Sequence, residues 1–380
     1  MPDPNPILTL IPSERPSPDN ATVLQNLGLL AELAGNWEGE GFNLIARPDF
    51  AQKTNLFLQL NDTHETLKFD PIGSPIPNRG FGQTDIALAG LTYLQKIHDA
   101  GGAGALHIEP GIWITQPNTT YPPEAAGAGQ QLIARMGTIP HGNSLLAQGI
   151  AAKFTGDPVL SIPGAQYNGS QFPSFNSTPF AVPPSPATPT LNAAGSSEAL
   201  TVPNPPGPPG FTQYDLALPA SATNTRTDPP PAGCTQLVLN DPILLLQAEI
   251  NKLKASGHSF AGTVLNISTQ AKVTFFTNPN SQPGAATTVV NVANGAGGIE
   301  NILFLEGGDP VGGVGANADT ALVYATFWIE KVSHPSRPSF MQLQYAQMVI
   351  LDFPIFAALP KVVNFGWPHI SVATLRKVFN

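Results

Sequence analysis

The residues best placed to do chemistry are a C-terminal histidine and the small residues that alternate with it. Residues 370–378 read as a β-strand, Ile-Ser-Val-Ala-Thr-Leu-Arg-Lys-Val, and His369 stands at its head, directly after Pro368. Because side chains alternate across a strand, His369, Ser371 and Ala373 share one face. The two small residues leave room beside the imidazole for a flat, bulky group such as an iron porphyrin. Heme iron needs one rigidly held neutral imidazole nitrogen, with the other nitrogen hydrogen-bonded. The alternative is a structural rim histidine bonded to a backbone carbonyl.

Other catalytic patterns are missing from the sequence. It contains no Gly-x-Ser-x-Gly nucleophile elbow, no Walker phosphate loop and no His-Glu-x-x-His zinc motif. The glycine-rich residues 307–315 include Pro310 and precede no predicted helix, so they predict a long hairpin and not a phosphate cradle. Cys234 is the single cysteine, which excludes an intramolecular disulfide and a zinc site built on several cysteines.

The composition argues against several classes of partner. Charged residues make up only 11% of the 380 residues, the net charge is −9, and no Lys/Arg cluster appears. Nucleic-acid binding needs a basic patch, so we expect none. No signal peptide is visible and no window approaches about 20 uninterrupted apolar residues, so we expect no membrane span and a cytoplasmic protein. The oligomeric state stays open, with a homodimer as one option.

Short extended segments predict an all-β protein. Gly, Pro, Asn or Asp separates most of them, as hairpin turns require. They lie at residues 37–45, 55–60, 65–69, 92–97, 105–115, 131–136, 262–269, 271–277, 302–305, 321–332, 341–351 and 370–378. Residues 242–253 predict a helix, with Asn240 or Asp241 as N-cap and Gly257 as its stop. The expected fold is an antiparallel up-and-down β-barrel with one or two short helices, in which the last strand pairs with the first and leaves no open edge.

A proline-rich stretch divides the predicted strands. Residues 158–231 hold 17 of the 41 prolines, and proline interrupts both helix and sheet. The stretch is either a linker between two domains or an ordered excursion along the surface of one. Its scattered aromatic residues favour the excursion: Tyr167, Phe172, Phe175, Phe180, Phe211 and Tyr214. We expect an N-terminal extension at 1–29, the first part of a barrel at 30–157, an insertion with a helix at 158–260, and the second part of the same barrel at 261–380. Ile370 and Val372 would face outward and predict that the insertion covers them.

Four segments, in order along the chain, resemble the nitrobindin family of heme-binding β-barrels. Residues 35–41 (Gly-Asn-Trp-Glu-Gly-Glu-Gly) match that family's Gly-x-Trp-x-Gly-x-Gly opening. Residues 65–75 are similar to its strand that ends in a Gly-x-Pro turn, and residues 106–113 to its Leu-His-x-Glu-x-Gly-aromatic stretch. Residues 369–377 are close to its closing His-x-x-x-Ala-Thr-Leu-Arg-Arg. The resemblance covers roughly residues 30–150 and 260–380.

The resemblance implies a ferric heme b whose iron is ligated by His369. Trp37 would plug one end of the barrel, and we count it with Ser371 and Ala373 as a candidate cofactor-binding residue. His107 is similar to the family position on the opposite, distal side of the heme, which makes it the candidate catalytic residue. The alternative for His107 is an ordinary strand residue that pairs with Glu109 and faces solvent.

The function expected from the resemblance is reaction with nitrogen oxides, namely NO binding and the isomerisation of peroxynitrite to nitrate. The chain is more than twice the length of a typical family member, and its insertion has no counterpart there. A heme enzyme acting on an organic or peroxide substrate is therefore one alternative. A heme-free carrier of a fatty acid or another apolar ligand is the other.

Overall fold

The computed structural model describes most of the predicted barrel. The described residues are 19–49, 54–102, 104–120, 123–139, 143–160, 216–217, 219–220, 225–269, 272–275, 288–291, 298–301, 319–355 and 363–378. The predicted strand at 302–305, the glycine-rich residues 307–315 and the aromatic residues named in the proline-rich stretch lie outside these ranges.

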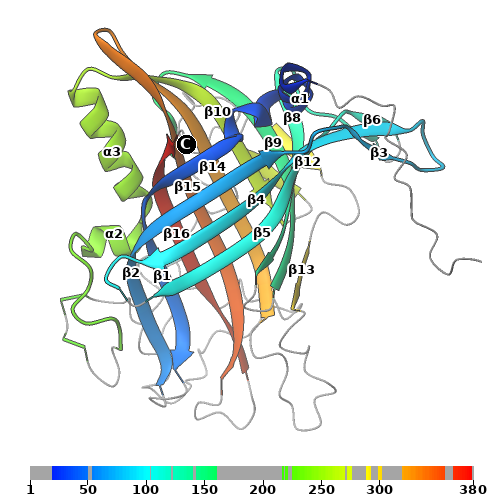
Figure 1. Ribbon diagram of the computed structural model, residues 1–380. Coiled ribbons are helices and arrows are strands. Elements are labelled where there is room, and N and C mark those ends of the chain that lie inside the picture. Colours follow the sequence, from blue (N-terminus) through cyan, green and yellow to red (C-terminus); the bar gives the residue numbers. More distant parts are fainter. Residues whose placement is uncertain are drawn as a thin grey trace, which may run out of the picture.

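Ten antiparallel strands form a closed up-and-down barrel, which confirms the predicted fold class (Figure 1). Each strand pairs with its neighbours in chain order, and closure leaves none of the ten at an edge. The strands are β1 (Gly35–Asp49), β2 (Thr54–Pro71), β4 (Ile86–Asp99), β5 (Ala105–Gln116), β8 (Gln130–Ile139), β9 (Asn143–Thr155), β10 (Ser259–Ser268), β14 (Asp319–His334), β15 (Arg337–Ile355) and β16 (Val363–Val378).

The last strand pairs with the first, as the sequence predicted. The register of β16 on β1 runs from Asn36 opposite Val378 to Ile45 opposite His369. Gly39 and Gly41 make this approach close, since a Cβ at Gly39 would lie 2.2 Å from the Thr374 carbonyl oxygen. The glycines of the first segment therefore allow β1 to coil against β16.

The chain leaves the barrel after β9 and re-enters it at the neighbouring strand. Residues 156–258 separate β9 from β10, yet the two strands pair antiparallel from Thr155 opposite Ala261 to Gln148 opposite Ser268. Strands from both halves of the sequence thus form one continuous wall.

Two helices cover one side of the barrel, visible at the left of Figure 1. They are α2 (Gln236–Asn240) and α3 (Ile243–Ala255). The Asp241 side chain accepts a hydrogen bond from the Ile243 backbone N–H at 3.2 Å, and Gly257 follows the helix with φ +88°. Four α3 side chains are buried: Ile243, Leu246, Ile250 and Leu253.

These helices pack on the outward side chains of the barrel wall. Ile370 and Val372 are each 1% exposed and belong to the same apolar cluster as the buried side chains of α3. Burying each such side chain contributes roughly 1.5–3 kcal/mol. The expectation that part of the insertion covers the closing strand is therefore met.

A short helical segment closes one end of the barrel. The strands β1, β4, β8 and β15 finish at the other end. The helical segment consists of α1 (Asn20–Leu27) and the 3-10 helix η1 (Gly28–Leu33). Trp37 is fully buried beneath it, and its Nε1 donates to the Leu33 carbonyl at 2.7 Å. We call this the plugged end and the other the open end.

Six short strands accompany the barrel. They are β3 (Ile76–Asn78), which pairs with β4, β6 (Thr119–Thr120) with β7 (Pro123–Glu124), β11 (Lys272–Phe275) with β12 (Thr288–Asn291), and β13 (Gly298–Asn301), which pairs with β9.

Three of the ten barrel strands differ most from the prediction. β16 begins at Val363, so His369 lies within the strand and not at its head. Residues 55–60 and 65–69 belong to one strand, β2, because the polar residues between them do not form a turn. Thr63 points into the barrel beside Glu65, and both are buried. β9 was not predicted, because its Ala and Gly residues have low strand propensity and pairing with β8 and β10 overrides it.

Candidate functional site

A cavity of about 310 Å³ lies inside the barrel at the open end. This volume is at the lower limit of the range of about 300–1,000 Å³ typical of small-molecule sites. Apolar and polar side chains share its wall. The lining residues are Asn43, Ile45, Arg47, Gln59, Gln95, Ile97, Leu106, His107, Ile139, Leu145, Val323, Tyr345, Gln347, Val349, Leu351, His369 and Ser371.

His369 projects into this cavity from β16. Its Nε2 lies 3.0 Å from the backbone carbonyl oxygen of Ala46 on β1. A carbonyl oxygen only accepts, so Nε2 carries the hydrogen, and in the neutral ring the lone pair is on Nδ1. Both interpretations of His369, as an iron ligand and as a structural rim histidine, require one ring nitrogen to be hydrogen-bonded in this way.

The other candidate cofactor-binding residues occupy different depths of the barrel. Ser371 lines the cavity beside His369. Ala373 is 1% exposed and lies deeper, opposite Tyr345 in the pairing of β15 with β16. Trp37 packs in the apolar core at the plugged end and does not line the cavity. The structure therefore brings His369 and Ser371 together and places Trp37 apart from them.

His107 lines the same cavity from β5, across the barrel interior from β16. Three strands separate β5 from β16 along the shorter way round the barrel, namely β1, β2 and β4. The His107 side chain is 18% exposed, and its Nε2 lies 3.3 Å from Glu109 Oε2. The predicted pairing with Glu109 is thus present, but it faces the barrel interior and not solvent, since Glu109 is fully buried.

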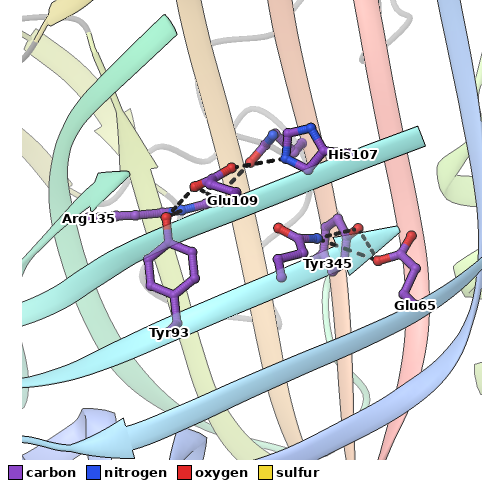
Figure 2. Close-up of polar contacts among 8 residues, drawn as sticks. Glu65, Tyr93, His107, Glu109, Arg135 and Tyr345 are labelled. Atoms are coloured by element: carbon purple, nitrogen blue, oxygen red, sulfur yellow. Dashed lines mark hydrogen bonds and ion pairs between the residues drawn. The ribbon is translucent and has the colours of Figure 1, made fainter. Parts of the chain in front are cut away.

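Glu109 belongs to a buried ion pair. Arg135 on β8 reaches Glu109 Oε1 with Nη2 at 2.7 Å, and its Nε donates to the Tyr93 hydroxyl at 3.0 Å (Figure 2). Arg135 Nη1 also donates to Gln347, which lines the cavity, at 2.8 Å. Tyr93 in turn donates to Glu109. Arg135 and Tyr93 therefore hold the Glu109 carboxylate, and this carboxylate in turn orients His107.

Electrostatics keep Glu109 ionised. Burial raises the pKa of a carboxyl, but here the attraction of Arg135 and the hydrogen bonds from His107 and Tyr93 outweigh it and lower the pKa of Glu109 to about 2. Burial raises the pKa of Tyr93 above its ordinary value, so this phenol stays neutral.

A second buried carboxyl, Glu65, lies behind Tyr345 and Gln95, and its contacts differ in kind. Tyr345 donates to Glu65 Oε2 at 2.5 Å (Figure 2). Thr63 donates to Oε1 at 2.9 Å, and Gln95 donates to the Tyr345 hydroxyl at 3.0 Å. These partners are all neutral. Burial raises the pKa of Glu65 in spite of its hydrogen bonds. The interior therefore holds one carboxyl whose pKa is lowered, Glu109, and one whose pKa is raised, Glu65.

Sequence reasoning did not predict that the polar residues supporting the cavity lie inside the barrel. For one of them, Glu109, the sequence did contain a signal. Glu109 shares one face of β5 with His107 and Trp113, and a tryptophan within a strand normally faces the core. An inward Trp113 requires an inward Glu109. Glu65, Arg135 and Tyr345 carried no such signal, because polar residues on a strand are ordinarily read as its solvent face.

The fold and the cavity define a cavity-containing up-and-down β-barrel, an architecture that can enclose one small ligand. No helix among the described residues is both long and apolar enough for a membrane crossing. No family model and no curated protein matches the sequence. Among solved structures, the crystal structure of Rv2717c from M. tuberculosis is similar at a TM-score of 0.33 and 11% identity, over 95% of this chain and 100% of that chain.

Proposed function

We propose that the barrel binds heme b at the open end, with His369 as the axial ligand of the iron. The observation that supports this proposal is that His369 lines the cavity while its Nε2 donates to the Ala46 carbonyl. Metal-ligating histidines almost always donate their second ring N–H to a carbonyl, a carboxylate or water. That bond fixes the tautomer, and the small Ser371 leaves space beside the ring.

The side chains of the cavity fit an iron macrocycle better than a bare metal ion. Among the described residues, no group of three or more His, Cys, Asp or Glu side chains is arranged to hold an ion. A porphyrin brings four of its own ligands and needs one imidazole from the protein. Ile45, Ile97 and Val349 offer apolar contact to its faces. A cavity of this size encloses only part of a porphyrin, so a bound heme would extend to the open end of the barrel.

Bound heme would supply a Lewis-acidic iron with a position open to NO, peroxynitrite or another small molecule. The protein's own contribution would come from the opposite wall. Glu109 holds a hydrogen on Nε2 of His107, so the imidazole is oriented and placed to polarise a ligand in the cavity. Arg135 keeps that carboxylate charged and fixed. Isomerisation of peroxynitrite to nitrate, which rests on the family resemblance, is the reaction we propose. A heme-dependent reaction on an organic or peroxide substrate is the alternative.

Titration with hemin tests the binding proposal. Wild-type protein should develop a Soret band at one equivalent of hemin, and His369→Ala should not. His98→Ala is the matched control, because His98 is exposed on β4 and should leave the spectrum unchanged. An identical heme spectrum in His369→Ala would remove His369 as the ligand.

Stopped-flow decay of peroxynitrite then tests the reaction. Loaded wild-type protein should accelerate the decay beyond free hemin and yield nitrate, and His107→Ala should slow it while retaining the Soret band. Equal decay rates for loaded protein and free hemin would rule out the isomerase proposal and leave heme binding intact.

A heme-free carrier is the second candidate function. The observation in its favour is the mixed wall, where apolar side chains share the cavity with Gln95, Tyr345 and Gln347. This arrangement fits a ligand with an apolar body and a polar end. A protein that gains no Soret band with hemin but binds a medium-chain fatty acid would establish the carrier.

A further inference from the structure

The polar part of the cavity wall carries hydrogen-bond donors and one permanent cation, Arg47. Arg47, His107 and His369 line the cavity, and the described lining contains neither Asp nor Glu. Glu109, the buried carboxylate that contacts His107, is neutralised by Arg135 at 2.7 Å. The cavity is therefore electrostatically suited to an anion or to the oxyanion end of a larger ligand.

Next to this lining lies a second carboxyl, Glu65, which contacts no cationic side chain among the described residues. Glu65 is 1% exposed, and the side chains that bond it are two hydroxyls and one amide, those of Tyr345, Thr63 and Gln95. An ionised carboxylate buried without a cation is costly, so the neutral acid is favoured in this position.

The protonation state of Glu65 decides what Tyr345 can offer to the cavity. When Glu65 is ionised, the Tyr345 hydroxyl donates its hydrogen to Glu65 and accepts one from Gln95. When Glu65 is neutral, the carboxylic acid donates to the phenol oxygen instead. The phenol hydrogen is then released from Glu65, and Tyr345, which lines the cavity, can donate it to a ligand.

We propose that the cavity binds a small oxyanion through the Tyr345 hydroxyl, and that this hydrogen bond forms only when Glu65 carries a proton. Binding therefore takes up one proton at pH values where free Glu65 is ionised. The ligand chemistry is a carboxylate or an inorganic oxyanion such as nitrate. The proposal goes beyond heme binding and does not depend on it, since neither Glu65 nor Tyr345 ligates the iron.

The groups around Glu65 determine how it titrates. Thr63 and Tyr345 are neutral, and burial together with Glu65 holds the pKa of Tyr345 well above 10. His107 on β5 is the titratable neighbour whose positive form favours the ionised carboxylate. Arg135 from β8 acts on Tyr345 and has Glu109 as its direct partner. His107 therefore has to be held constant in any test.

Calorimetric titration with octanoate and with sodium nitrate, at a series of pH values from 4.5 upward, separates these contributions. Glu65→Gln retains a neutral donor beside Tyr345 and cannot titrate, and both proteins keep His107. The affinity of wild-type protein should fall by up to tenfold per pH unit relative to Glu65→Gln. Tyr345→Phe should bind about tenfold or more weakly wherever Glu65 is protonated. Octanoate alone binding would assign a carboxylate with an apolar tail, and nitrate binding a free anion.

Two results would overturn the proposal. One is a constant affinity ratio between wild type and Glu65→Gln at all pH values. The other is wild-type affinity in a folded Tyr345→Phe. If neither variant folds, wild-type titrations in buffers of different ionisation enthalpy still decide, because binding without proton uptake at every pH above 4.5 contradicts the coupling. Failure of hemin to bind would leave these measurements unaffected.

Discussion

Replacing Arg135 by methionine should destabilise the barrel strongly, because it leaves a buried carboxylate without its cation. The Arg135 side chain is 2% exposed and Glu109 is fully buried, and their contact measures 2.7 Å. Methionine keeps most of the side-chain volume against the neighbouring rings of Tyr93, Trp113 and Phe327. The substitution therefore removes mainly charge and hydrogen bonds.

Removing one partner of a buried ion pair typically costs about 3–5 kcal/mol. For a domain of this size, each kcal/mol lowers Tm by roughly 2–4 °C, so we expect a loss of roughly 6–20 °C. The double variant Arg135→Met, Glu109→Gln removes both charges, and it should cost less than the sum of the single changes by about 1–3 kcal/mol.

The pH dependence of the unfolding free energy supplies an independent check on the ion pair between Arg135 and Glu109. In the folded protein the pKa of Glu109 is lowered from 4.5 to about 2, so its ionised form stabilises the fold above pH 4.5, and this stabilisation is lost as pH falls toward 2. The difference in unfolding free energy between wild type and Arg135→Met should therefore narrow over that window.

Urea unfolding at several pH values measures the cost of Arg135→Met, the non-additivity in the double variant and the pH dependence of that cost. Thermal unfolding measures the loss in Tm. His98→Ala, an exposed position on β4, serves as the control for a change that leaves the interior untouched. A cost below about 1 kcal/mol for Arg135→Met, or strict additivity in the double variant, would refute the assignment of this pair as a buried, mutually dependent unit.

Three further predictions concern the barrel and its cover. Gly149→Val should prevent β9 from pairing with β10, since a Cβ there would lie 1.8 Å from the Asn266 carbonyl oxygen; limited proteolysis should show the opening, and Gly73→Ala, with open space around it, should not. Glu330→Gln should remove a pH dependence of stability, because burial raises the pKa of Glu330 from 4.5 to about 8. The contribution of Glu330 to wild-type stability is therefore full below pH 4.5 and falls by up to about 1.4 kcal/mol per pH unit as pH rises to 8. The same pH dependence of the unfolding free energy in both proteins, measured with urea, would contradict this. Leu246→Ala should cost about 2–5 kcal/mol in the free energy of unfolding, as for other buried leucines, and a cost within 0.5 kcal/mol would show that α3 is not packed on the barrel.

The sequence was most informative where alternation and pairing act together. The face shared by His369 and Ser371 points inward, and Ile370 and Val372 point outward beneath α3. Both follow from the period of two in a strand whose partner, β1, was identified as well. The position of α3 and its stop at Gly257 followed from local chemistry in the same way, but the N-cap is Pro242 and not Asn240 or Asp241, and Asp241 accepts only from the Ile243 N–H.

The polar side chains inside the barrel could not be predicted from strand alternation in the same way. Glu65 and Tyr345 are 280 residues apart, and their hydrogen bond depends on the closure of the whole barrel. Single-sequence patterns read a glutamate on a strand as exposed, so they place it on the wrong face whenever a cavity is polar. The same effect divided β2 in two, because the buried Thr63 lies in a segment with the composition of a turn.

The central claim, that His369 is the iron ligand, is tested most directly by replacing the imidazole and then supplying it in solution. His369→Gly, titrated with hemin, should lose the wild-type heme spectrum and regain it when free imidazole is added, with His98→Gly unchanged throughout. A His369→Gly protein that shows the wild-type heme spectrum without imidazole would contradict the assignment.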